Sequence, residues 1–182
     1  MKFRLMFLFG ATILFSAAAA VFTLTEFTLT LTFVDFINMG TVECIGGQPL
    51  RDPAGPPCSA GSRVNIRGNV ARYAVTATDP RLTGTAAVTM NLNGDGWRPT
   101  GPGSGPMWGP YSLEVSKGEV WEGFWSGNRT ASPEGEVHYA NHIVMHGTGG
   151  RIQGLKAEFD VVSSGPNYAA TASGWILAPA GK

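Results

Sequence analysis

The three histidines of the chain lie four residues apart within one segment, EVHYANHIVMHGTGG, as His138, His142 and His146. Imidazole is a common metal ligand and a frequent general acid or base near neutral pH. On a helix this spacing would bring neighbouring histidines to about 5–6 Å between Cβ atoms, close enough to bind one metal ion. On a β-strand the histidines share a face but lie roughly 13 Å apart, which is too far for a shared ion.

The residues around the histidines favour the strand. Glycines follow directly and would end a helix, and β-branched and aromatic residues alternate with the histidines. We therefore predict no metal site and no cofactor. The apolar face of this strand lies opposite the histidines, which places them outside the core, although Ala140 and Val144 on their own face leave a lined interior open. The candidate acids or bases for a reaction inside the fold are His138, His142 and His146, with Glu122.

The N-terminal segment has the layout of a secretory signal. Lys2 and Arg4 precede an apolar run at 5–13, and a stretch of small residues follows. We predict a signal peptide over residues 1–20 and a secreted or periplasmic protein. The alternative is an uncleaved membrane anchor, because apolar character continues to Leu24 and approaches the roughly 20 residues that span a bilayer. Membrane contact is expected only in that case.

Composition indicates one turn-rich β domain over residues 21–182. The chain has 25 glycines, 12 prolines and 43% apolar residues, a balance more typical of β proteins than of helical bundles. Its 13 Lys and Arg residues balance 13 Asp and Glu residues, which argues against nucleic acid or another strongly charged partner.

The two cysteines, Cys44 and Cys58, flank a loop rich in glycine and proline, IGGQPLRDPAGPP. In an exported chain such a pair is most simply a disulfide, and the spacing is not that of a C-x-x-C metal or redox motif. Closing a loop of this length would stabilise the fold by about 3 kcal/mol in the chain-entropy model.

Period-two alternation predicts strands along the chain. The clearest case is GLKAEFDVV at 154–162, where Leu155, Ala157, Phe159 and Val161 share one face and charged residues share the other. The pattern changes parity at Glu26, where either the mature N-terminus or a β-bulge is expected, and around Gly68, as a β-bulge or a tight turn would produce. Short turn signals separate the runs, so we predict an all-β antiparallel barrel of about eight strands, with a β-sandwich as the alternative. The segment 97–109 is predicted to be a second Gly/Pro-rich loop.

Tryptophan alternates with glycine in the segment VWEGFWSGN, where Trp121 and Trp125 share a face. These indole rings either fill the core beside the glycines or line an apolar cavity at a barrel mouth. On the second interpretation the ligand-binding residues are Trp108, Tyr111, Trp121 and Trp125.

Three segments, GPMWGPYSLEV, GEVWEGFWSG and GTGGRIQGL, resemble the sheet pattern of small barrel proteins of the allene oxide cyclase and dirigent type. The resemblance covers about the last third to half of the chain. It implies an eight-stranded barrel with a pocket for an apolar ligand, and in some members cyclisation or stereocontrol of coupling. The chain has no matching set of catalytic residues that can be carried over.

Three hypotheses for function follow from these features. The first is an exported barrel that binds a small apolar molecule. The second is a cofactor-free cyclase or isomerase in which a histidine moves a proton inside the barrel. The third is a structural protein of the cell envelope with no pocket. Enzymatic activity is therefore left open.

Overall fold

The computed structural model describes residues 22–46, 58–59, 62–98, 101–164 and 169–179. The predicted signal peptide at 1–20 and most of the cysteine loop lie outside these ranges. The described residues are almost all β, with two short 3-10 helices, η1 (Pro80–Leu82) and η2 (Gly150–Ile152). In this part of the chain, no helix is both long enough and apolar enough to cross a membrane.

Eight long strands form the body of the fold, and short strands extend it. They are β1 (Phe22–Asn38), β2 (Thr41–Ile45), β3 (Arg63–Ala77), β4 (Gly84–Gly94), β5 (Trp97–Arg98), β6 (Gly101–Pro102), β7 (Gly105–Ser116), β8 (Glu119–Ala131), β9 (Val137–Thr148), β10 (Lys156–Ser164) and β11 (Ala170–Pro179).

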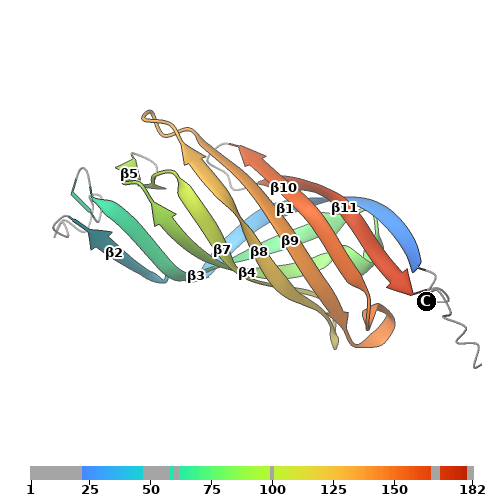
Figure 1. The fold of residues 1–182 in the computed structure, drawn as a ribbon. Coiled ribbons are helices and arrows are strands. Elements are labelled where there is room, and N and C mark those ends of the chain that lie inside the picture. The colour runs from blue at the N-terminus through green and yellow to red at the C-terminus, as the bar shows by residue number, and fades with distance from the viewer. Residues whose placement is uncertain (1–21, 47–57, 60–61, 99–100, 165–168, 180–182) are drawn as a thin grey trace, which may run out of the picture.

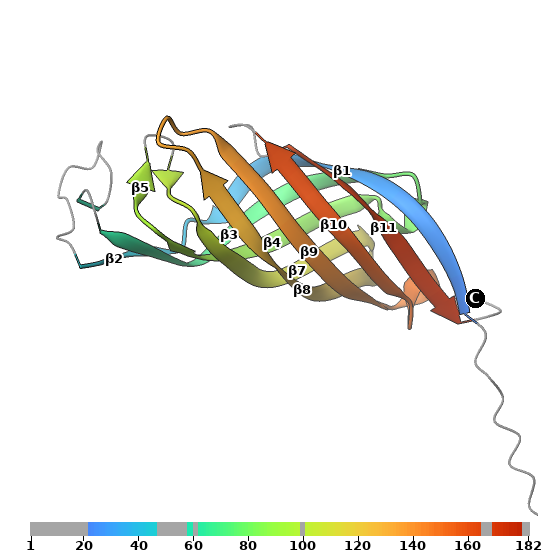
Figure 2. The same cartoon turned by 45° about the horizontal axis from the view of Figure 1, so that its top comes forward.

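The long strands close into an eight-stranded antiparallel barrel (Figure 1). Their order is β1-β11-β10-β9-β8-β7-β4-β3, and β1 also pairs with β3. The N-terminal part of β1 pairs with β11 and the C-terminal part with β3, with an overlap at Leu29–Leu31. Figure 2 shows β1 beside β11 at this closure. The predicted barrel is thus confirmed over the sandwich.

Strand β2 pairs along the edge of β3 beyond the end of β1, and the Cys44–Cys58 disulfide joins it to residue 58. The predicted pairing of the two cysteines is confirmed, with Cα atoms 5.5 Å apart. Such a bond is compatible with an oxidising extracellular or periplasmic location.

The alternation of burial follows the predicted faces. Leu155, Ala157, Phe159 and Val161 are all buried. A register shift occurs between Ile66 and Asn69, where a bulge was predicted. Of the two alternatives at Glu26, the bulge is wrong, because β1 pairs with β11 through that position without a break. The parity changes there because Phe22 and Leu24 point outward and are 53% and 57% exposed.

The loop predicted at 97–109 is also a wrong assignment. This segment forms the hairpin β5–β6 and the first residues of β7. Its glycines suggested a loop, but Gly105 and Gly109 lie within β7, where the backbone of β4 approaches closely. A Cβ at either position would collide with the carbonyl oxygen of Asn93 or of Thr89. Glycine here serves close packing inside a sheet.

One end of the barrel is closed by buried side chains. The plug contains Leu82 of η1, Ile152 of η2, and Leu113, Trp121 and Leu155, all essentially inaccessible to solvent. The Trp121 Nε1 donates a hydrogen bond to the Arg81 carbonyl oxygen at 2.7 Å, which ties η1 to the barrel wall.

Asp79 caps η1 at this plug. Its carboxylate accepts hydrogen bonds from the Arg81 backbone N–H at 2.9 Å and from Arg81 Nη2 at 2.7 Å. The Arg81 side chain, more than the backbone bond, holds the pKa of Asp79 below its ordinary value. The charged form of Asp79 therefore stabilises the folded state.

Asp79→Asn is expected to cost about 1–2 kcal/mol of unfolding free energy at pH 7, because a charge-assisted hydrogen-bond pair is lost. The wild-type advantage should be complete above the ordinary carboxyl pKa of 3.8 and should disappear as the pH falls through the lower folded pKa. Urea unfolding of both proteins from pH 7 to pH 2.5 measures the difference. Asp35→Asn, which removes an exposed ion pair with Arg72, is the control, and an equal loss there would contradict the assignment.

Candidate ligand cavity inside the barrel

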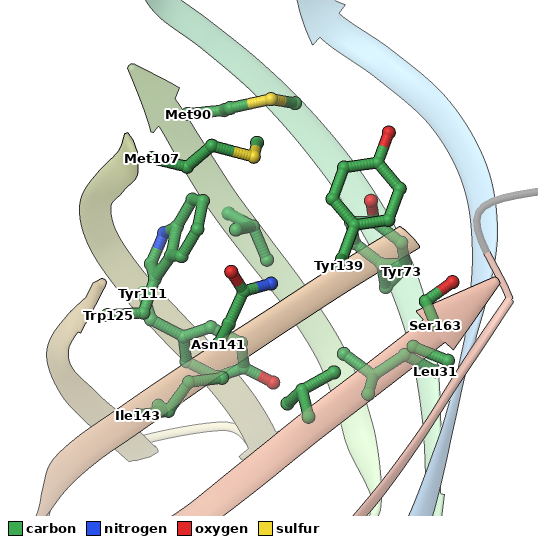
Figure 3. A pocket seen from close by; sticks show the side chains of 13 residues that line it. Leu31, Tyr73, Met90, Met107, Tyr111, Trp125, Tyr139, Asn141, Ile143 and Ser163 are labelled. Carbon is green, nitrogen blue, oxygen red and sulfur yellow. The ribbon is translucent and has the colours of Figure 1, made fainter. Parts of the chain in front are cut away.

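A cavity of about 80 Å³ lies inside the barrel between the plug and the opposite end (Figure 3). Most of its lining is apolar, with a few polar groups. The lining residues are Leu31, Tyr73, Val88, Met90, Met107, Tyr111, Trp125, Tyr139, Asn141, Ile143, Val161, Ser163 and Ala170.

The cavity has a buried floor and an open mouth. Tyr111, Trp125 and Ile143 are buried at the floor, whereas Tyr73 and Tyr139 are only half-buried. Along β8, Trp121 belongs to the plug and Trp125 to the cavity, so the mouth faces the end of the barrel away from the plug. A ligand would enter from the end at which β2 and β5 lie (Figure 1).

Two buried polar groups of the lining have no hydrogen-bond partner among the described residues. They are the Tyr111 hydroxyl and the Asn141 Oδ1. Burial raises the pKa of Tyr111 far above its ordinary value of 10.0, so its phenol stays protonated and can donate a hydrogen bond. Leaving such a group unsatisfied costs about 1–3 kcal/mol. The cavity therefore offers a donor and an acceptor to whatever occupies it.

Two glycines leave room beside Asn141 and Trp125, two side chains of the cavity lining. A Cβ at Gly127 would collide with the Asn141 side chain, which β8 and β9 hold opposite it. A Cβ at Gly109 would collide with the Thr89 carbonyl oxygen, which accepts a hydrogen bond from Trp125 Nε1 at 3.0 Å. Gly127, which belongs to the Trp/Gly alternation of β8, thus makes room for a side chain of β9, and Gly109 of β7 makes room for the backbone of β4.

The four predicted ligand-binding residues separate into three groups. Tyr111 and Trp125 line the cavity. Trp121 points inward but is part of the plug. Trp108 lies on the outer face, where the Arg67 guanidinium carbon is 5.2 Å from its ring centroid. Trp121 thus fills the core, whereas Trp125 lines the cavity at its buried floor rather than at a barrel mouth.

The histidines lie on the outer face of β9, as their parity predicted. His138, His142 and His146 are exposed, and so is Glu122 on β8. The His142 Nδ1 lies 2.8 Å from Asp160 Oδ1, and its Nε2 lies 3.5 Å from Glu158 Oε1. None of these four candidates lines the cavity, so their placement does not support proton transfer inside the barrel. Within the described ranges, no cluster of three or more His, Cys, Asp and Glu side chains could hold a metal ion.

Sequence reasoning missed Asn141, Tyr139 and Tyr73 as cavity residues. The signal for the first two was present, because Asn141 and Tyr139 share the parity of Ile143, on the face opposite the histidines. Tyr73 likewise shares the parity of Val75 on its strand.

Fold and cavity together define the class of protein: a closed eight-stranded antiparallel barrel with a half-open, mostly apolar internal cavity. Comparisons with protein-family models, with curated proteins and with solved structures find no match for this chain.

Proposed function

We propose that this protein is an exported binding barrel whose internal cavity holds a small, mainly apolar molecule. The observation that carries the proposal is the pair of unpartnered polar groups in an otherwise apolar lining, the Tyr111 hydroxyl and the Asn141 Oδ1. Small-molecule sites commonly combine an apolar wall with a few polar groups that orient the ligand. A purely structural barrel gains nothing from leaving two such groups unsatisfied.

The size of the cavity limits the buried part of the ligand. Its volume of about 80 Å³ is roughly half that of a 150 Å³ apolar cavity that accepts benzene. A chain of about three to five carbon atoms therefore fits without rearrangement. Met90 and Met107 border the cavity, and methionine side chains adapt readily to neighbours, so modest enlargement is available.

Export is supported by two independent features. The N-terminal segment has a basic start followed by an apolar run and small residues. The Cys44–Cys58 disulfide is typical of proteins in oxidising compartments. A secreted or periplasmic barrel would meet its ligand outside the cytoplasm.

Titration with 1-hexanol tests the proposal, because this alcohol has an apolar chain and a hydroxyl that both donates and accepts. We expect a saturable shift of the Trp125 indole N–H resonance in NMR spectra, assigned with Trp125→Phe, and no shift of the outer-face Trp108 indole. An unchanged Trp125 resonance throughout a series of alcohols and matched hydrocarbons would contradict the proposal.

Tyr111→Phe is expected to change binding and stability in opposite directions. It should weaken 1-hexanol binding by roughly tenfold, because about 1.4 kcal/mol of hydrogen bonding is lost. It should also raise the unfolding free energy of the empty protein by about 1 kcal/mol, since an unsatisfied buried hydroxyl is removed. NMR titration and urea unfolding measure the two effects. A variant that is less stable and binds 1-hexanol normally would argue against a ligand role for this hydroxyl.

A further inference from the structure

Arg129 places a buried positive charge beside Tyr139, one of the residues that line the cavity. Its side chain faces inward on β8 and is 4% exposed. It lies one inward position beyond Gly127 and pairs across the sheet with Tyr139. The guanidinium carbon is 5.8 Å from the ring centroid of Tyr139, which lines the cavity.

The hydrogen bonds of Arg129 satisfy one side of its guanidinium. Nη1 donates to the carbonyl oxygens of Pro102 and, at 3.0 Å, of Gly103, both in the segment of the β5–β6 hairpin. Among the residues that the structure describes, none accepts a hydrogen bond from Nε or Nη2, and no carboxylate forms an ion pair with this arginine. Arg72, Arg81, Arg98 and Arg151 each pair with a carboxylate.

A buried charge without a counter-charge is costly, and proteins normally pair it. Nε and Nη2 of a guanidinium form a planar two-donor edge that matches the two oxygens of a carboxylate. The backbone carbonyls that hold Nη1 fix the orientation of the group but carry no compensating charge. A cation without a carboxylate partner among the described residues thus lies beside the cavity lining, which suits a ligand with one negative charge and an apolar body.

We infer that the ligand is a small monocarboxylate whose carboxylate pairs with Arg129 and whose mainly apolar chain fills the cavity, where a polar substituent on the chain would meet the Tyr111 hydroxyl and the Asn141 Oδ1. This inference rests on the proposed function and specifies its ligand class. The cavity volume of about 80 Å³ favours short acids over long-chain fatty acids, because only three to five or so carbons fit below the mouth.

The test compares hexanoate, 1-hexanol and hexylamine, three probes of one chain length, by NMR of the Trp125 indole at pH 7. In the wild type we expect hexanoate to bind at least about tenfold more tightly than 1-hexanol, and hexylamine to bind more weakly than both. Hexanoate affinity should fall as the pH drops through roughly 4–5, where carboxyl groups become protonated. The affinity for 1-hexanol should stay constant over that range.

Arg129→Gln should lower hexanoate affinity to the level of 1-hexanol, and Arg129→Lys should keep part of the difference. Arg72→Gln, on the outer face, is the matched control and should bind hexanoate like the wild type. If Arg129→Gln does not fold, two other measurements test the inference. They are the ratio of hexanoate affinity to 1-hexanol affinity in the wild type, and the same ratio in Arg129→Lys.

Equal affinities for hexanoate and 1-hexanol in the wild type would overturn the inference and leave the proposed function standing. Failure of all three probes to move the Trp125 resonance would overturn both. Asp52 is a carboxylate that lies outside the described residues. The variant Asp52→Asn therefore tests whether Asp52 is the ion-pair partner of Arg129. If this variant destabilised the empty protein as much as Arg129→Gln does, Arg129 would have an internal partner and the carboxylate inference would fall.

Discussion

Trp121→Ala is expected to lower the free energy of unfolding by about 3–5 kcal/mol, the largest effect of any single substitution considered for this barrel. Trp121 is 0% exposed and closes the plugged end together with Leu82 and Ile152. Its removal leaves a large void and also leaves the Arg81 carbonyl oxygen without its 2.7 Å hydrogen bond. Urea unfolding followed by circular dichroism measures the change.

Two variants separate packing from hydrogen bonding at this position. Trp121→Phe keeps much of the ring volume and should cost less than the alanine variant, because mainly the bond to the Arg81 carbonyl is lost. Trp108→Ala removes a half-exposed indole from the outer face of β7 and should cost about 1 kcal/mol or less. Equal losses for Trp121→Ala and Trp108→Ala would show that Trp121 does not hold the plug.

The barrel could be predicted because its strands bury one face, and such strands alternate polar and apolar residues with a period of two. The run from Leu155 to Val161 is regular enough to fix the inward face from sequence alone. The same parity placed His138, His142 and His146 outside, which the structure confirms. Parity also separates Trp108 from Tyr111, since the two are an odd number of residues apart on one strand.

The division between plug and cavity could not be predicted in this way. Trp121 and Trp125 share a face and a glycine-rich setting, so the local sequence does not distinguish them. Their difference arises from contacts distant in the chain: η1 covers Trp121 through the Arg81 carbonyl, whereas Trp125 bonds to Thr89 of β4 beside open space. Which inward residue meets a void depends on how all eight strands pack.

Arg129 shows the same limit for a charged residue. Its position near the end of a strand suggests an exposed side chain, since arginine is rarely fully buried. It is buried because the β5–β6 hairpin carries the Pro102 and Gly103 carbonyls to it, a contact that spans more than twenty residues.

The resemblance to allene oxide cyclase and dirigent barrels stays a prediction, as do the cyclase and envelope hypotheses, and ligand binding can be tested independently of them.

Loss of the Cys44–Cys58 disulfide is expected to destabilise the fold by about 3 kcal/mol. The bond spans a sequence separation of 14, and opening a loop of this length returns about that much conformational entropy to the unfolded chain. The transition midpoint should fall by roughly 6–12 °C for a domain of this size. Thermal unfolding of Cys44→Ala/Cys58→Ala, and of the wild type with and without a reducing agent, measures the effect.

The position of this disulfide allows its effect on stability to be separated from any effect on the ligand site. It joins β2 to residue 58, and among the strands described β2 pairs with β3 alone. The cavity is lined by residues of the eight barrel strands and by none of β2. The reduced protein should therefore bind hexanoate and 1-hexanol with unchanged relative affinity at temperatures well below its lowered midpoint. A selective loss of hexanoate binding on reduction would mean that the disulfide-bonded loop contributes to the carboxylate site beside Arg129.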